Sequence, residues 1–167
     1  MADAVDEIQR RWRRERPDLD ADLWPVGIVG RVQRLNRVLE RELKKFNSAH
    51  GIETWEFDVL TTLRRSGEPY ELTAGALLKA MMVTSGAITN RIDRLESKGW
   101  VERVRDDVDR RSVRIRLTDE GNRIVDEIFG LHLANEARLL PELGEEQYEQ
   151  LSGLLRTLLE HFGDTEL

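Results

Sequence analysis

A run of small, amide and basic side chains occupies one face of a predicted helix at residues 85–98. On a helical wheel, Ile88, Ile92 and Leu95 form the inward face of this helix. The remaining faces carry side chains that suit hydrogen bonding and methyl contacts to base edges in a DNA major groove, namely Ser85, Ala87, Thr89, Asn90 and Arg94. We interpret this face as a candidate DNA-reading surface. An ordinary solvated polar face is the alternative.

Two neighbouring features support a DNA contact. Thr84 is predicted to cap the helix, where its hydroxyl and the free N–H groups can hold a phosphate. A polar loop at residues 106–111 contains Asp109, Arg110 and Arg111. Arginines at a hairpin tip suit a minor groove, and Asp109 would orient a guanidinium. Such tips also occur for solubility alone, but this one directly follows a helix-turn-helix pattern.

The elements that must position these residues are mainly helical. Apolar periodicity predicts a short helix that Pro17 ends, a helix at 26–48, and a helix that Thr54 caps. Thr73 and Thr118 are predicted to cap later helices. Further predictions are an extended piece at Leu72, helices at 74–81 and 85–98, strands at 101–105 and 112–117, and two C-terminal helices separated near Pro141. We therefore predict a mainly α fold with a small β-wing, in which a winged helix-turn-helix joins a helical dimerisation region.

The predicted domains are N-terminal helices at 1–50, a DNA-binding domain at 51–120 and C-terminal dimerisation helices at 121–167. The last helix carries a broad apolar stripe of Leu151, Leu154, Leu155, Leu158, Leu159 and Phe162. A stripe this wide needs a partner. Packing against a second copy of the chain is the favoured interpretation, and burial within one chain is the alternative.

Charge is distributed unevenly along the chain, whose net charge is −6. Residues 84–116 contain nine basic and six acidic residues, whereas residues 119–167 contain three and twelve. A locally basic segment can engage phosphates although the whole chain is acidic. The charge balance therefore permits DNA binding.

Several function classes are disfavoured. The chain has no cysteine, and its three histidines form no short-spaced pair, so thiol chemistry and a zinc site are not expected. No nucleophile–base pairing or phosphate loop is present, and Gly27 and Gly30 form only an isolated GxxG. We expect no enzyme activity and no cofactor. The absence of a signal peptide or apolar span predicts a cytoplasmic protein.

The run TSGAITNRIDRLESKGWVERVRDDVDRRSVRIRLTDEG resembles the core of MarR family regulators. This resemblance implies a winged helix-turn-helix homodimer that binds palindromic operators in double-stranded DNA and a small-molecule effector. The N-terminal segment with WRRERPDLD, together with WEFDVL, is similar to the urate-responsive branch. That similarity implies ligand contacts from Trp12, Asp58, Arg91 and Arg103.

The residues themselves support these ligand contacts unevenly. Arg91 lies at the border of its helix's apolar stripe, where a guanidinium can offer two donors to a planar anion. A helical wheel places Asp58 beside Thr61 and Thr62 on a polar side, where a simple ion pair or a solvated carboxylate is the alternative. Trp12 could instead anchor a dimer.

Strand alternation places Arg103 on the side of Val101, and a phosphate contact or a salt bridge within the wing is its alternative role. The sequence as a whole predicts a homodimeric repressor released from its operator by a small organic anion such as urate. An effector-independent winged helix that binds DNA or docks on a protein is the alternative. The arginines at positions 10–16 are read as a solvated helix face and not as a membrane contact.

Overall fold

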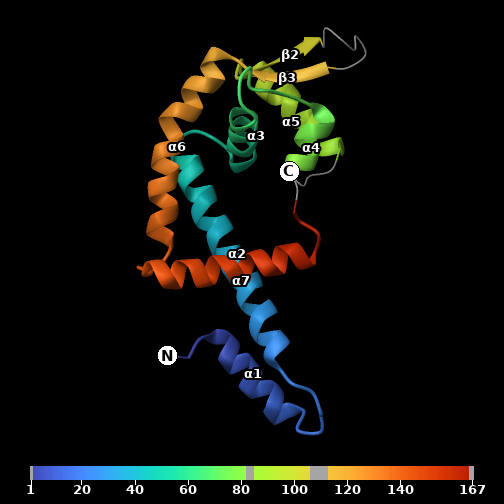
Figure 1. The fold of residues 1–167 in the computed structure, drawn as a ribbon, viewed down its shortest axis with the longest axis vertical. Helices are drawn as coiled ribbons and strands as arrows, with labels where there is room; N and C mark the ends of the chain where they lie inside the picture. Colours follow the sequence, from blue (N-terminus) through green and yellow to red (C-terminus); the bar gives the residue numbers. More distant parts are fainter. Residues whose placement is uncertain (1, 82–84, 106–112, 166–167) are drawn as a thin grey trace. The chain divides into compact units, whose positions relative to one another are not determined.

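The computed structural model describes residues 2–81, 85–105 and 113–165, with only the backbone of residues 85–87 (Figure 1). Its helices are α1 (Ala4–Glu15), α2 (Trp24–Ala49), α3 (Thr54–Arg65), α4 (Ala74–Met81), α5 (Ser85–Ser97), α6 (Asp119–Leu139) and α7 (Glu145–His161). Its strands are β1 (Glu71–Thr73), β2 (Val101–Arg105) and β3 (Val113–Leu117). The chain divides into two compact units, Met1–Lys45 and Phe46–Leu167.

The second unit contains the winged helix-turn-helix that the sequence predicts. Its antiparallel sheet has the order β1-β3-β2, with Val101 opposite Leu117 and Leu72 opposite Ile115. Helix α5 packs against β2, α3 and α4, and α6 packs against α3 and β3. The predicted class, mainly helical with a small β-wing, is therefore confirmed.

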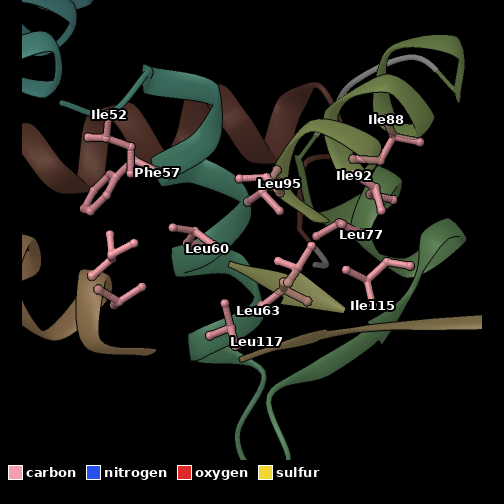
Figure 2. Packing of buried hydrophobic residues seen from close by; sticks show 14 of the residues in the cluster. Ile52, Phe57, Leu60, Leu63, Leu77, Ile88, Ile92, Leu95, Ile115 and Leu117 are labelled. Carbon is pink, nitrogen blue, oxygen red and sulfur yellow. The ribbon is translucent and has the colours of Figure 1, made fainter. Parts of the chain in front are cut away.

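A single apolar cluster fixes these elements (Figure 2). Leu60 and Leu63 of α3, Leu77 of α4 and Leu95 of α5 are completely buried. Full burial of one such side chain contributes about 1.5–3 kcal/mol to folding. The cluster therefore holds α5 against the rest of the unit without help from another chain.

The helix boundaries follow local hydrogen bonding. The hydroxyl of Thr73 accepts from the N–H of Ala76 at 3.1 Å, and that of Thr118 accepts from the N–H of Gly121 at 3.1 Å, so both predicted caps are confirmed. Thr54 was expected to cap α3 but is its first helical residue, and Glu53 is the cap. The carboxylate of Glu56 accepts from the Glu53 N–H at 3.0 Å, which fixes the start one residue earlier.

The expected polar position of Thr62 is wrong. Its side chain is buried, because α4 packs against α3 and covers part of that helix. The wheel for α3 identifies the apolar face correctly at Leu60 and Leu63, but it cannot show a second packing surface made by a neighbouring helix.

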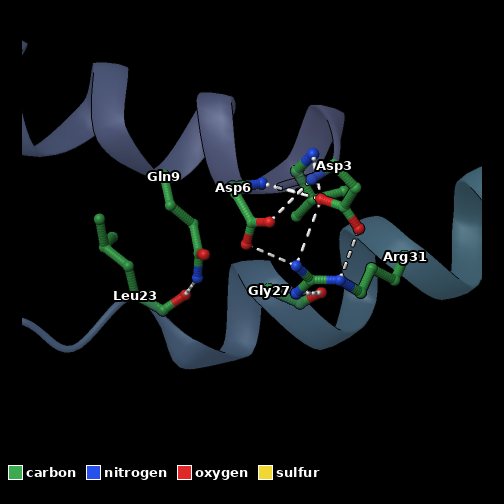
Figure 3. Close-up of polar contacts among 7 residues, drawn as sticks. Asp3, Asp6, Gln9, Leu23, Gly27 and Arg31 are labelled. Atoms are coloured by element: carbon green, nitrogen blue, oxygen red, sulfur yellow. Dashed lines mark hydrogen bonds and ion pairs between the residues drawn. The ribbon is translucent and has the colours of Figure 1, made fainter. Parts of the chain in front are cut away.

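In the first unit, charged and polar contacts join α1 to the beginning of α2 (Figure 3). The Arg31 guanidinium donates to the Asp3 carboxylate at 2.8 Å and to the Asp6 carboxylate at 2.6 Å. The Gln9 amide donates to the Leu23 carbonyl at 2.7 Å. Asp3 also caps α1, because its carboxylate accepts from the N–H of residue 5 at 2.8 Å.

The isolated GxxG of the sequence lies at this contact. A Cβ added to Gly27 would lie 2.8 Å from the Gln9 amide nitrogen, and one added to Gly30 would lie 3.3 Å from the buried Val5 side chain. The two glycines therefore allow close approach of two helices, which accounts for the motif without a phosphate site.

Many large apolar side chains of the terminal helices are exposed. Along α7 and its end, they are Leu151, Leu154, Leu155, Leu158, Leu159 and Phe162. In the first unit they include Trp24, Val29, Val32 and Leu35. Surfaces with this much exposed apolar area are typical of protein interfaces.

Candidate DNA-binding and ligand sites

Helix α5 presents a polar face because the opposite face is in the core. Ile88, Ile92 and Leu95 are each at most 2% exposed, as the wheel predicts. Thr89 and Asn90 lie on the exposed side. The helix ends where Gly99 takes a φ of +72°, which ordinary side chains rarely adopt. The chain then turns into β2.

The predicted DNA-reading residues are described to different extents. Thr89, Asn90 and Arg94 are exposed on α5. Ser85 and Ala87 belong to the same helix by their backbone. Thr84 and the loop residues Asp109, Arg110 and Arg111 lie outside the described residues.

Arg94 does not extend freely from its helix. Its guanidinium carbon lies 4.7 Å from the centre of the Trp55 ring on α3. The Arg91 guanidinium carbon lies 5.7 Å from the same ring. Two side chains predicted to have different roles therefore face one aromatic ring that the sequence analysis did not select. Its only sequence signal was a large aromatic residue three positions before Asp58.

Asp58 and Arg91 interact electrostatically. Asp58 is on the exposed side of α3, yet the surrounding protein displaces enough water to raise the pKa of its carboxyl above the usual value. The positive charge of Arg91 opposes this rise in pKa, and His132 and Arg65 oppose it to a smaller extent. The two positions on α3 and α5 that are predicted to contact a ligand are therefore within electrostatic range of each other.

Arg103 connects the wing to α5. It donates to the Asp93 carboxylate at 2.5 Å and also bonds the carboxylate of Glu96. The hydrogen bond to Asp93 is the main reason why the pKa of Arg103 is raised. Arg103 therefore forms salt bridges, but its partners are on α5 and not within the wing as the alternative expected, so these bonds tie β2 directly to α5.

Trp12 belongs to the first unit, where its side chain is 52% exposed. It lines a mainly apolar cavity of about 270 Å³ together with Leu19, Leu23 and Val26, and Arg13 and Arg16 border the same cavity. The ring is therefore available both for packing against a partner and for contact with a small molecule.

A buried ion pair was also missed by sequence reasoning. Glu56 of α3 is completely buried, and the Lys98 ammonium donates to its carboxylate at 2.6 Å. The same ammonium lies 4.3 Å from the centre of the Trp100 ring. A glutamate one position before the buried Phe57 gave no signal of burial, because helix wheels assign charged residues to solvent. This pair connects the start of α3 with the end of α5.

Within the described part of the chain, no group of three or more histidine, aspartate or glutamate side chains is arranged to hold a metal ion. The same residues include no helix that is long and apolar enough to cross a membrane.

Comparison with known proteins places this geometry in a family. A model of the MarR family matches residues 50–112. The HTH-type transcriptional regulator PecS of Dickeya dadantii is 38% identical over 157 residues, which cover 94% of this chain and 93% of PecS. The crystal structure of a mutant MarR from E. coli complexed with operator DNA has a TM-score of 0.71 and 30% identity, and the match covers 83% of this chain and 99% of that one.

The structure of AbsC, a MarR family transcriptional regulator from Streptomyces coelicolor, has a TM-score of 0.75 at 23% identity, covers 84% of this chain and 96% of AbsC, and shows likeness of fold alone. The identity between this chain and PecS, and the share of both chains that the match covers, are high enough to show that the two proteins belong to one family. The chain therefore belongs to the MarR family, and it is a DNA-binding transcription regulator with a winged helix-turn-helix rather than an enzyme.

Proposed function

We propose that the chain is a homodimeric repressor that binds a palindromic operator in the cytoplasm and is released by a small organic anion such as urate. The DNA-binding part of this proposal rests on one observation. Thr89 and Asn90 are exposed on a helix whose opposite side is buried. A rigid helix with exposed amide and hydroxyl groups suits major-groove reading.

The proposed reading surface contains residues of α5 together with residues that lie outside the described part of the chain. Ser85, Ala87, Thr89, Asn90 and Arg94 are assigned to the major groove, Thr84 to a phosphate, and Arg110 and Arg111 with Asp109 to the minor groove. The E. coli MarR relative was crystallised with operator DNA, which supports this use of the same fold. Several phosphate contacts in each half-site would make operator affinity fall steeply with salt.

Dimerisation is proposed from the uncovered apolar surfaces. The stripe of α7 and the apolar residues of the first unit are the surfaces assigned to a second copy. A two-fold dimer presents two reading helices, which matches a palindromic operator. We accordingly propose that residues 1–50 and 121–167 serve pairing while residues 51–120 bind DNA.

The proposed effector contacts are Trp12, Asp58, Arg91 and Arg103. Arg91 supplies paired donors for a planar anion, and its positive charge opposes the rise in the pKa of Asp58, so the two groups interact. Arg103 is proposed to act on the effector site only indirectly, because its guanidinium already bonds the carboxylates of two residues of α5. Trp12 is proposed on the similarity to the urate-responsive branch, which the 38% identity with PecS supports without establishing it.

The proposal is tested with the DNA upstream of the chain's own coding sequence. Operator affinity is measured by fluorescence anisotropy with and without urate for wild type, Arg91→Ala and Arg123→Ala. Arg123 is the matched control because it bonds Glu120 and Glu127 within α6, away from α5. We expect urate to weaken binding by about 5- to 150-fold in wild type and in the control but not in Arg91→Ala.

Three outcomes would reject parts of the proposal. Equal weakening in all three proteins would remove Arg91 from the effector site. Operator binding with no response to urate, and no rise in melting temperature with a panel of purines and organic acids, would favour the effector-independent regulator. Failure to bind upstream DNA at low salt would contradict the repressor assignment itself.

A further inference from the structure

The Trp55 ring lies beside the guanidinium groups of Arg91 and Arg94. The guanidinium carbons of Arg91 and Arg94 are 5.7 Å and 4.7 Å from the ring centre. Among the described residues, neither guanidinium forms an ion pair within 4 Å. The ring is half-buried against the core and is therefore held in place. One half-buried aromatic ring thus lies within cation–aromatic distance of two guanidinium groups.

The two arginines are close enough to the same ring to compete for it. They are three residues apart on α5, so their side chains leave the helix on the same side. Like charges at this spacing repel each other, whereas the electron-rich face of an indole attracts each of them. Arginine stacks on aromatic rings more readily than lysine does, because its guanidinium is planar and weakly hydrated. Removal of one guanidinium therefore strengthens the hold of the ring on the other.

The two arginines also have different neighbours. Asp58 lies one helical turn beyond Trp55 on α3 and attracts Arg91. Arg94 lies one turn beyond the exposed Asn90 on α5 and is nearer to the ring than Arg91 is. Trp55 consequently lies between a proposed effector contact and a proposed DNA contact.

We propose that Trp55 is a positioning residue that couples effector binding to DNA reading by exchanging these two arginines. When a planar organic anion draws Arg91 toward itself, the ring holds Arg94 more tightly, and Arg94 is withdrawn from the operator. When no anion is bound, Arg91 and Arg94 share the ring, as in this structure, so Arg94 is held less tightly and can leave the ring for operator DNA. This inference rests on the proposed function and adds the route by which the effector acts.

If Trp55 couples effector binding to DNA binding, its replacement has an effect that the replacement of a purely structural tryptophan would not have. Loss of the aromatic face should leave Arg94 free whether or not the effector is present. Trp55→Leu keeps an apolar side chain but removes the ring, and Trp55→Phe keeps a smaller ring. The leucine variant should then bind operator at least as tightly as wild type without effector. A general loss of packing would weaken operator binding instead.

The experiment measures operator affinity by anisotropy, with urate as the probe, for wild type, Trp55→Leu and Trp55→Phe. The ratio of dissociation constants with and without urate is the coupling. We expect Trp55→Leu to reduce this ratio by about 3-fold or more, the scale of one cation–aromatic contact, and Trp55→Phe to recover part of it. In an Arg94→Ala background, Trp55→Leu should have no further effect on the ratio. Melting temperatures identify any variant that fails to fold.

A second measurement does not depend on urate. The Nε–Hε resonance of Arg94 should be shifted by the ring current of Trp55 in the free protein, and operator DNA should remove that shift. An unchanged Arg94 resonance on addition of DNA would overturn the exchange even in a variant series that folds poorly.

The remaining outcomes separate this inference from the proposed function. If urate weakens wild type and Trp55→Leu equally, the coupling role of Trp55 is rejected while the effector assignment stands. If wild type binds operator but does not respond to urate, the effector assignment is rejected and the coupling is rejected with it. If the leucine and phenylalanine variants lose the response equally, the ring face is not the cause.

Discussion

Helices α5 and α7 both carry apolar stripes, but among the described residues of the second unit only the stripe of α5 is covered. Ile88, Ile92 and Leu95 are each at most 2% exposed, whereas no residue of α7 is buried. The proposed DNA-reading helix is therefore positioned by the core of its own chain. The apolar surface of α7 has no such cover within the second unit, so its burial depends on an additional surface. The surface proposed to read DNA and the surface proposed to form the dimer therefore depend on different kinds of packing.

The buried ion pair offers the sharpest test of how α5 is held. Lys98→Met leaves the Glu56 carboxylate buried without its cation, and we expect a loss of about 3 kcal/mol in the free energy of unfolding. That value is at the lower end for a buried pair, because the Lys98 side chain is partly exposed. Urea denaturation measures the change.

The double variant Glu56→Gln, Lys98→Met is the control for this prediction. The amide can still accept from the Glu53 N–H, and no uncompensated charge remains. Most of the lost stability should return. A double variant that is less stable than Lys98→Met would mean that the ion pair does not hold α5 in this way.

Two glycines of α6, Gly121 and Gly130, differ in how closely the surrounding protein packs against them. A Cβ at Gly121 would lie 2.1 Å from the Trp100 carbonyl oxygen, so Gly121→Ala requires a backbone shift and should cost about 2–3 kcal/mol. Gly130 has open space around it, and Gly130→Ala should raise the stability of the isolated chain by up to about 1 kcal/mol. Equal effects of the two substitutions on thermal unfolding would contradict the close approach at Gly121.

Self-association tests the uncovered stripe directly. Leu155→Arg places a charge in the apolar stripe of α7, whereas Glu149→Arg places the same charge on the opposite side of that helix. We expect the first substitution to raise the dissociation constant of the dimer by about 30-fold or more and the second to have little effect. Sedimentation velocity distinguishes a species of 19.4 kDa from its dimer. A wild-type chain that is monomeric at micromolar concentration would contradict the proposed role of the α7 stripe in dimerisation.

Asp58 gives the smallest expected effect. Desolvation raises its pKa in the folded state, so the folded chain binds this proton more tightly than the unfolded chain, whose aspartates titrate near pKa 3.9. Its contribution to stability is largest in acid and decreases as the pH rises through the raised pKa. Asp58→Asn should therefore melt slightly higher than wild type at pH 7, with no difference below about pH 3. A lower melting temperature at pH 7 would show that attraction to Arg91 prevails.

The sequence predicts the winged helix well because its signals are local and repeated. Thr73 and Thr118 cap their helices as expected, and the alternation of Val113, Ile115 and Leu117 identifies β3. These features depend on residues within a few positions of one another. They need no knowledge of how distant segments pack.

The parts that sequence reasoning missed depend on contacts between elements. Glu56 is buried because Lys98, 42 positions away, supplies a cation, and Thr62 is buried because α4 covers it. The position of Arg94 over Trp55 likewise joins α5 to α3. A wheel describes one helix at a time and therefore gives no information about such pairs. The roles of Asp109, Arg110 and Arg111 remain predictions.

The discrimination between operator and scrambled DNA by Asn90→Ala is the most direct test of the account. Asn90 is exposed on the helix that the core fixes, and an amide contact to one base should be worth about 1–3 kcal/mol of discrimination. We predict that Asn90→Ala binds operator about 5- to 150-fold more weakly while its affinity for scrambled DNA is unchanged. Unchanged affinity for both DNAs would contradict the assignment of α5 as the reading helix.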